Sequence, residues 1–96
     1  MIYTQKILEP LSNAELDTVV IDIVYDANPC EMPKFKPSTS YRCAGAVIGT
    51  LVEMGFVVQI GHRGVAVGGI NDTRWVVELQ EYARALCIAA ILAVQG

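Results

Sequence analysis

The sequence predicts an α+β fold in which about three helices pack on a small antiparallel β-hairpin or three-stranded sheet. Two segments, 14–25 and 41–54, show apolar residues at helical spacing behind a cap of hydroxyl side chains. Residues 56–67 are rich in valine and contain glycines at a turn, which is typical of a hairpin. Residues 78–94 carry the most regular helical pattern in the chain. A length of 96 residues fits a single domain spanning 1–96.

The first predicted helix runs from about Ala14 to about Tyr25. It follows the capping-box sequence Ser12-Asn13-Ala14-Glu15, in which serine and glutamate satisfy each other's backbone N–H groups. Residues 19–24 are largely β-branched, so a strand is the alternative there, and the cap favours the helix. Three aspartates are expected on the solvated face, where a metal site is the less favoured interpretation: Asp17, Asp22 and Asp26.

The second predicted helix follows a proline-rich loop over residues 27–37, which cannot form a regular helix. Ser38, Thr39 and Ser40 offer N-cap hydroxyls, and helix capping explains them better than a nucleophile does because no GxSxG elbow surrounds them. Gly55 is the expected C-terminal cap. Since glycine inside a helix costs roughly 1 kcal/mol, Gly45 and Gly49 predict close packing on a neighbouring element.

The hairpin is expected to pair residues 56–60 with residues 65–67 across the turn Gly61-His62-Arg63-Gly64. Residues 68–72 are rich in glycine, asparagine and aspartate and predict a second turn. Residues 74–77 read either as a short third strand or as the lead-in to the last helix. Trp75 is expected to shield the core.

The last helix is apolar on every side beyond its first turn. Its main face follows the i, i+3, i+4, i+7 pattern, and the opposite face becomes apolar as well. A domain of this size has room for few central helices, so the second apolar face predicts contact with another copy of the chain. The candidate interface residues are Ala85, Ile88, Ala89 and Leu92.

The bulk composition supports self-association. The chain is 53% hydrophobic and 18% charged, with a mean hydropathy of +0.42. No apolar run approaches the 20 or so residues that a membrane span needs, and Met1–Lys6 shows no secretory leader. Cys30, Cys43 and Cys87 are too few and too widely spaced for a disulfide framework or a zinc site, so a reducing, cytoplasmic setting is expected. The prediction is a homo-oligomer, with a dimer favoured.

The candidates for chemistry are weak. His62 and Arg63 could hold an anion or nucleotide between two glycines, although a hairpin turn accounts for the pattern. Nucleic-acid binding through Lys34, Lys36, Arg63 and Arg74 is disfavoured by the net charge of −3 and by the absence of a basic cluster. No cofactor, metal or catalytic motif is present, so no cofactor is expected and the chain is predicted not to be an enzyme.

Three segments in order resemble the phage NinX-like family. They are residues 11–20, which begin Leu11-Ser12-Asn13-Ala14-Glu15-Leu16-Asp17, residues 35–48, in which Pro37-Ser38-Thr39 with Tyr41 and Gly45 is the strongest match, and the alanine-rich stretch 82–91 that contains Arg84. The family pattern has tryptophan where Tyr41 stands and Gly-Pro where Ala46-Val47 stand. The resemblance implies a small accessory protein of a phage or prophage in the bacterial cytoplasm, with a host or phage protein as a possible partner. It transfers no catalytic residue.

Taken together, these observations predict a non-enzymatic, self-associating protein-interaction module. The alternatives are an anion or nucleotide binder using the His62–Arg63 turn and a nucleic-acid accessory factor. The sequence alone favours the interaction module because its apolar surplus is clear and its chemical sites are not.

Overall fold

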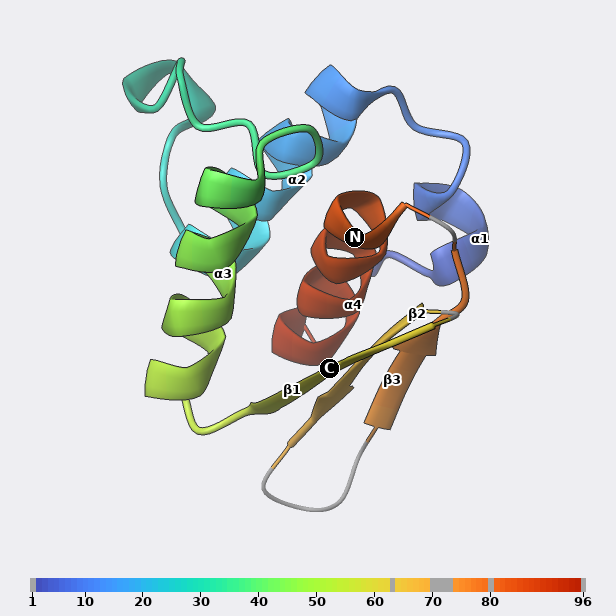
Figure 1. The fold of residues 1–96 in the computed structure, drawn as a ribbon. Helices are drawn as coiled ribbons and strands as arrows, with labels where there is room; N and C mark the ends of the chain where they lie inside the picture. The colour runs from blue at the N-terminus through green and yellow to red at the C-terminus, as the bar shows by residue number, and fades with distance from the viewer. Residues whose placement is uncertain (1, 63, 70–73, 80, 96) are drawn as a thin grey trace.

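The fold is a three-stranded antiparallel sheet with helices gathered on one of its faces (Figure 1). The computed structural model describes residues 2–62, 64–69, 74–79 and 81–95. In chain order the elements are α1 (Gln5–Leu8), α2 (Asn13–Tyr25), a short 3₁₀ turn (Pro29–Glu31), α3 (Tyr41–Glu53), β1 (Val57–Gly61), β2 (Gly64–Gly68), β3 (Arg74–Val77) and α4 (Tyr82–Gln95). The predicted α+β class is confirmed.

The sheet has the strand order β1-β2-β3, with both pairings antiparallel. Gly61 pairs with Gly64 across the predicted hairpin turn, and Val67 pairs with both Val58 and Trp75. Residues 74–77 therefore form a third strand and are not a lead-in to the last helix. The predicted turn at 68–72 falls largely outside the described residues.

Local caps set the ends of α2 and α3. The Glu15 N–H donates to Ser12 Oγ (3.2 Å) and the Ser12 N–H donates to Glu15 Oε1 (3.1 Å), which completes the predicted capping box and confirms a helix over residues 19–24. These bonds from Ser12 lower the pKa of Glu15, with the backbone bond contributing most. At α3, Ser40 is the N-cap residue, and Gly55 follows the helix at a φ of 95°, a value that glycine adopts without strain.

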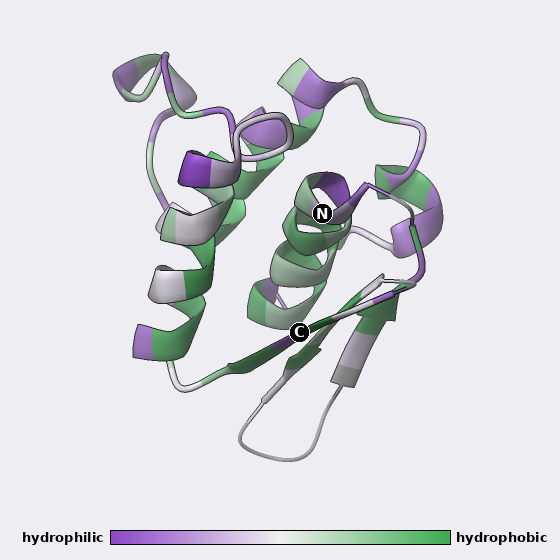
Figure 2. Cartoon of the chain, viewed as in Figure 1, coloured by the Kyte–Doolittle hydropathy of each residue, from purple (hydrophilic) through white to green (hydrophobic). Residues whose placement is uncertain are grey.

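Helix α4 is the centre of the molecule. It begins at Tyr82, later than the sequence pattern at 78 suggested, and contacts the sheet through β2 and β3. Helices α2 and α3 pack on its other sides, and α1, which the sequence did not predict, lies against it as well. Figure 2 shows hydrophobic colouring along α4, whereas hydrophilic residues concentrate on the surrounding helices and loops.

The sheet buries one face against α4 and leaves the other in solvent. Val65, Val67 and Val77 point toward α4 and are fully buried. Alternate residues point outward, and of these Val57 is 63% exposed and Val76 is 53% exposed. The outward face of the sheet is therefore the face that α4 does not cover.

Candidate interaction surfaces

The predicted interface on the last helix is wrong. Ala85, Ile88 and Ala89 are fully buried and Leu92 is only 4% exposed, all within a single chain. A 96-residue domain was expected to have room for few central helices, and α4 is one of them. The 14 residues of α4 are short enough for one small sheet and three helices to surround them, and its alanines let those neighbours approach closely.

The predicted close packing at Gly45 and Gly49 is also wrong within this chain. A Cβ atom built on either glycine has nothing within 4 Å, and both positions are exposed on α3. The glycine that does need its small size is Gly64, where an added Cβ would lie 1.9 Å from the Val77 carbonyl oxygen. At that position the backbone of β3 fills the space that a side chain would take.

The weak chemical candidates are dispersed over the surface. His62 is exposed at the hairpin turn, and Arg63 and the side chain of Arg74 lie outside the described residues. Lys34 and Lys36 are exposed on the proline-rich loop, and Phe35 between them packs edge-on against Tyr25 with ring centroids 5.2 Å apart. Trp75 is half-buried against the core, as predicted.

A polar cluster, buried at Asp17 and Ser38 and partly exposed at Arg84, joins the segments that carry the family resemblance. The Ser38 N–H donates to Asp17 Oδ1 at 2.8 Å, and the Ser38 hydroxyl donates to the Asn13 carbonyl at 3.3 Å. Arg84 donates to the Asn13 side chain and to the backbone carbonyls of Glu9 (3.1 Å) and Leu11 (2.9 Å). The cluster holds α2, the segment before α3 and the start of α4 together.

This cluster corrects the prediction that Asp17 lies on a solvated face. Asp17 is 7% exposed, whereas Asp22 on the same helix and Asp26, the residue that follows the helix, are exposed as expected. Ser38 is buried as a donor in this cluster, while Ser40 is the residue that caps α3. The groups of the cluster bond to one another, and together they connect α2, the segment before α3, the start of α4 and the segment between α1 and α2.

Cys87 lies beside this cluster and is fully buried. Burial raises the pKa of its thiol far above the ordinary value of 9.0, the Asp17 carboxylate adds to the rise, and Arg84 opposes it in part. A thiol held in its protonated form is a poor nucleophile and metal ligand. Among the described residues, no group of three His, Cys, Asp or Glu side chains is arranged to hold a metal ion.

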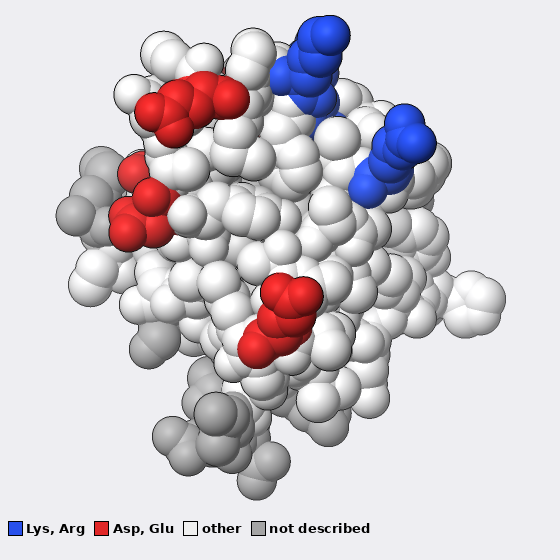
Figure 3. Space-filling view, turned by 90° about the vertical axis from the view of Figure 1, so that its left-hand side faces the viewer, with Lys and Arg blue, Asp and Glu red and all other residues white. Residues whose placement is uncertain are grey.

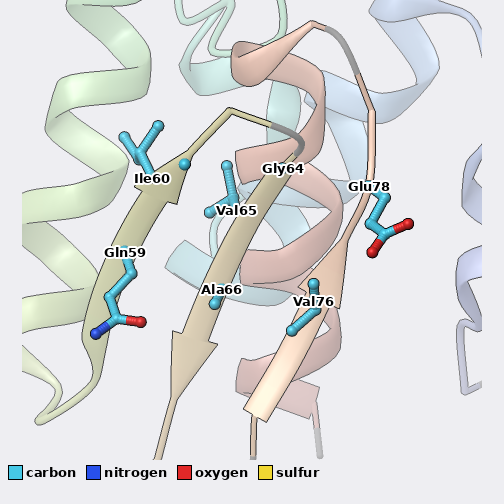
Figure 4. A pocket seen from close by; sticks show the side chains of 8 residues that line it. Gln59, Ile60, Gly64, Val65, Ala66, Val76 and Glu78 are labelled. Carbon is cyan, nitrogen blue, oxygen red and sulfur yellow. The ribbon is translucent and has the colours of Figure 1, made fainter.

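The outer face of the sheet carries a shallow hollow of about 610 Å³, whose lining includes Ala66, Val76, Gln59 and the carboxylate of Glu78 (Figure 4). The central strand contributes only small outward residues, namely Gly64, Ala66 and Gly68. Figure 4 shows Gln59 on β1 and Val76 on β3 standing on either side of Ala66. The face thus has two raised edges and a furrow along β2.

A second hollow, which we call the α3–β1 groove, lies between helix α3 and the free edge of β1. It has a volume of about 240 Å³ and is lined by Tyr41, Gly45 and Ile48 from α3, Ile60 from β1, and Tyr82 and Leu86 from α4. None of these side chains is charged. Figure 3 views the molecule from the α3 side and shows a largely uncharged surface with a few separate charged groups.

No helix in the part of the chain that the structure describes is both long and apolar enough to cross a membrane. The longest described helix, α4, has 14 residues, against the 20 or so that a bilayer requires. Comparison of the chain with protein-family models, with curated proteins and with solved structures finds no match.

Proposed function

We propose that this chain is a non-enzymatic protein-interaction module that associates with a second copy of itself through the outer face of its sheet. The observation that carries the proposal is the lack of polar alternation in the strands. A sheet with one solvated face normally places polar residues outward. Here Val57, Ala66 and Val76 point outward from the three strands beside the uncharged Gln59, and the charged Glu78 stands just past the end of β3.

The shape of this face supports a second copy as the occupant. In a twofold dimer the same surface meets itself, so it must offer both projections and recesses. Val57 and Val76 project from the edge strands, and the glycines and alanine of β2 form the recess between them. Gln59 and Ala66 at the centre are neutral, so the centres of two such faces can approach without repulsion between like charges, while the exposed Glu78 lies at the margin, just past the end of β3.

The size of the face predicts a weak dimer. Three strands of about five residues cover a footprint of about 240 Å² at the usual strand spacing and rise. Stable interfaces commonly bury about 800 Å² on each partner. Association is therefore expected to appear only as the protein concentration rises, and to be reversible on dilution.

Sedimentation equilibrium from micromolar to millimolar concentration tests this proposal. The average mass should rise from one chain toward two. Val76→Lys, which places a charge on the outer face, should keep the protein monomeric, whereas the control Val52→Lys, an exposed position on α3, should leave association unchanged. A mass of one chain throughout, or equal association by Val76→Lys and the native protein, would rule the outer face out.

As part of the same proposal, the module serves a phage or prophage as an accessory protein in the bacterial cytoplasm. The support for this is the motif resemblance, whose segments around Asp17, Ser38 and Arg84 meet in one hydrogen-bonded cluster. Such a role requires a partner protein as well as self-association. The α3–β1 groove offers a surface for that partner, separate from the outer face of the sheet.

A further inference from the structure

We propose that the α3–β1 groove binds an extended, uncharged peptide segment, which adds to the sheet as a fourth strand beside β1. This surface is distinct from the outer face on which the proposed self-association rests. The inference combines the exposed edge of β1, the apolar surface of α3 and the absence of charge between them.

The first observation is the edge of β1. β1 is an outer strand of the sheet, and among the strands that the structure describes it pairs with β2 alone. In an antiparallel strand, alternate residues direct their N–H and C=O groups away from the partner, and an extended chain can pair with them. Edges that must not pair usually carry a charged residue, a proline or a bulge. The β1 sequence VVQIG contains no charge or proline, and its register with β2 runs without a bulge.

The second observation is that α3 extends past this edge. Figure 4 shows α3 on the side of β1 away from β2, so a strand added there would lie next to the helix. The residues Tyr41, Gly45, Ile48 and Val52 recur at helical spacing and form one apolar stripe. Tyr41 is 79% exposed and Val52 is 57% exposed. This stripe lies where a helix in a two-layer fold would normally cover a strand.

The third observation is the space within the groove. Ile60 points toward the helix side of the sheet, like Val58 and Val65, yet it is 55% exposed because α3 does not cover it. Gly45 has open space where its side chain would be. The hollow between α3 and β1 is thus open at Gly45 and at Ile60, where a further backbone would enter.

The chemistry of the lining selects the occupant. Because Tyr41, Ile48, Ile60 and Leu86 provide no charge, a charged side chain entering the groove would lose its hydration without gaining a partner. The row of backbone groups on β1 favours an extended chain over a helix. A second copy pairing through its own β1 is disfavoured, because the twofold axis would bring the two overhanging α3 helices against each other.

A displayed library of short random peptides tests the inference. Panning against the intact protein should enrich uncharged sequences with large apolar residues at alternate positions. The best peptide is then synthesised together with two N-methylated forms, each blocking one alternate set of its backbone N–H groups. One form should bind about tenfold more weakly or worse, and the other about as well as the parent, because only one edge of an added strand faces β1.

Protein variants assign the binding to the groove. Gly45→Leu fills the space beside Ile48 and should weaken the parent peptide by about tenfold or more. Ala46→Leu, at an exposed position outside the groove lining, is the matched control and should bind normally. Helical ellipticity and melting temperature should be at least maintained in Gly45→Leu, since leucine favours helix over glycine, and should change little in Ala46→Leu, since alanine and leucine are both strong helix formers.

Three outcomes would overturn the inference: no enrichment of peptides, equal weakening by both N-methylated forms, or equal binding by Gly45→Leu and the native protein. If hydrogen exchange of the β1 amides slows as the protein concentration rises, and no peptide binds, the edge of β1 pairs with a second copy. That result would also overturn the inference. None of these results depends on whether Val76→Lys alters sedimentation, so failure here leaves the proposed self-association separately testable.

Discussion

The Ser38 amide donates a 2.8 Å hydrogen bond to the Asp17 carboxylate in the interior of the protein, although 21 residues separate the two in the chain. This bond connects α2 to the segment that leads into α3. Because Ser38 is also bonded to the Asn13 carbonyl, two positions on α2, one turn apart, fix the approach of the proline-rich loop.

Replacing Asp17 should therefore destabilise the fold. Asp17→Ala leaves the buried Ser38 N–H without an acceptor, and the expected loss is about 2–3 kcal/mol of unfolding free energy. Asp22→Ala, at an exposed position on the same helix, should change stability by less than about 0.5 kcal/mol. Urea denaturation of both variants measures the difference. Equal stability of the two variants would contradict the role assigned to the buried carboxylate.

Arg84 should hold the segment between α1 and α2 in place. Arg84→Met keeps much of the aliphatic stem but removes donors to the Glu9 and Leu11 carbonyls and to the Asn13 side chain. We expect a loss of about 1–3 kcal/mol and faster amide exchange at residues 7–11. Arg42→Met, on the exposed side of α3, is the control. Unchanged exchange at 7–11 would show that Arg84 does not anchor this segment.

The glycines should separate into two classes. Gly49→Ala should stabilise the protein by about 0.5–1 kcal/mol, because alanine favours helix and its Cβ meets nothing within 4 Å. Gly64→Ala should destabilise it by about 2–3 kcal/mol, because the added Cβ would overlap the Val77 carbonyl oxygen and the strands must move apart. Thermal unfolding of the two variants should shift in opposite directions. A loss of stability in Gly49→Ala would imply a packing contact at that glycine.

Local signals in the sequence predicted much of the fold. The capping box at Ser12 and Glu15 placed α2, and Ser40 and Gly55 bracketed α3, because helix ends are set by residues within one turn. Helix α1 was missed since its four residues are too few to show a period. For residues 74–77 the sequence allowed either a third strand or the lead-in to the last helix, and the pairing with β2 shows that they form a strand.

Long-range packing accounts for the errors. The burial of Asp17 depends on a donor 21 residues away, and the enclosure of Ile88 depends on how elements from the whole chain surround α4. Neither the burial of Asp17 nor the enclosure of Ile88 produces a pattern in the neighbouring sequence. The outer face of the sheet does produce a sequence pattern, because β2 reads Gly-Val-Ala-Val-Gly and has no polar position. Only the strand register shows that Ala66 points outward beside Gln59 and Val76.

Cys87 predicts how stability depends on alkaline pH. Its folded-state pKa is raised, so the folded protein retains the thiol proton while the unfolded chain releases it near the ordinary value of 9.0. The contribution is constant below that pH and is lost progressively above it, at up to about 1.4 kcal/mol per pH unit. Cys87→Ala removes this titration, so its unfolding free energy should fall less steeply above pH 9 than that of the native protein.

Thiol labelling tests the same burial without unfolding the protein by alkali. Cys30 is exposed and should react with iodoacetamide in the native state, whereas Cys87 should react only after denaturant is added. Mass spectrometry of the peptides that contain each cysteine distinguishes the two. If Cys87 were labelled in the native protein as readily as Cys30, α4 would open to solvent on the timescale of the reaction. The enclosure of Ile88 and Leu92 by a single chain would then be transient, and the last helix would again be available to a second copy.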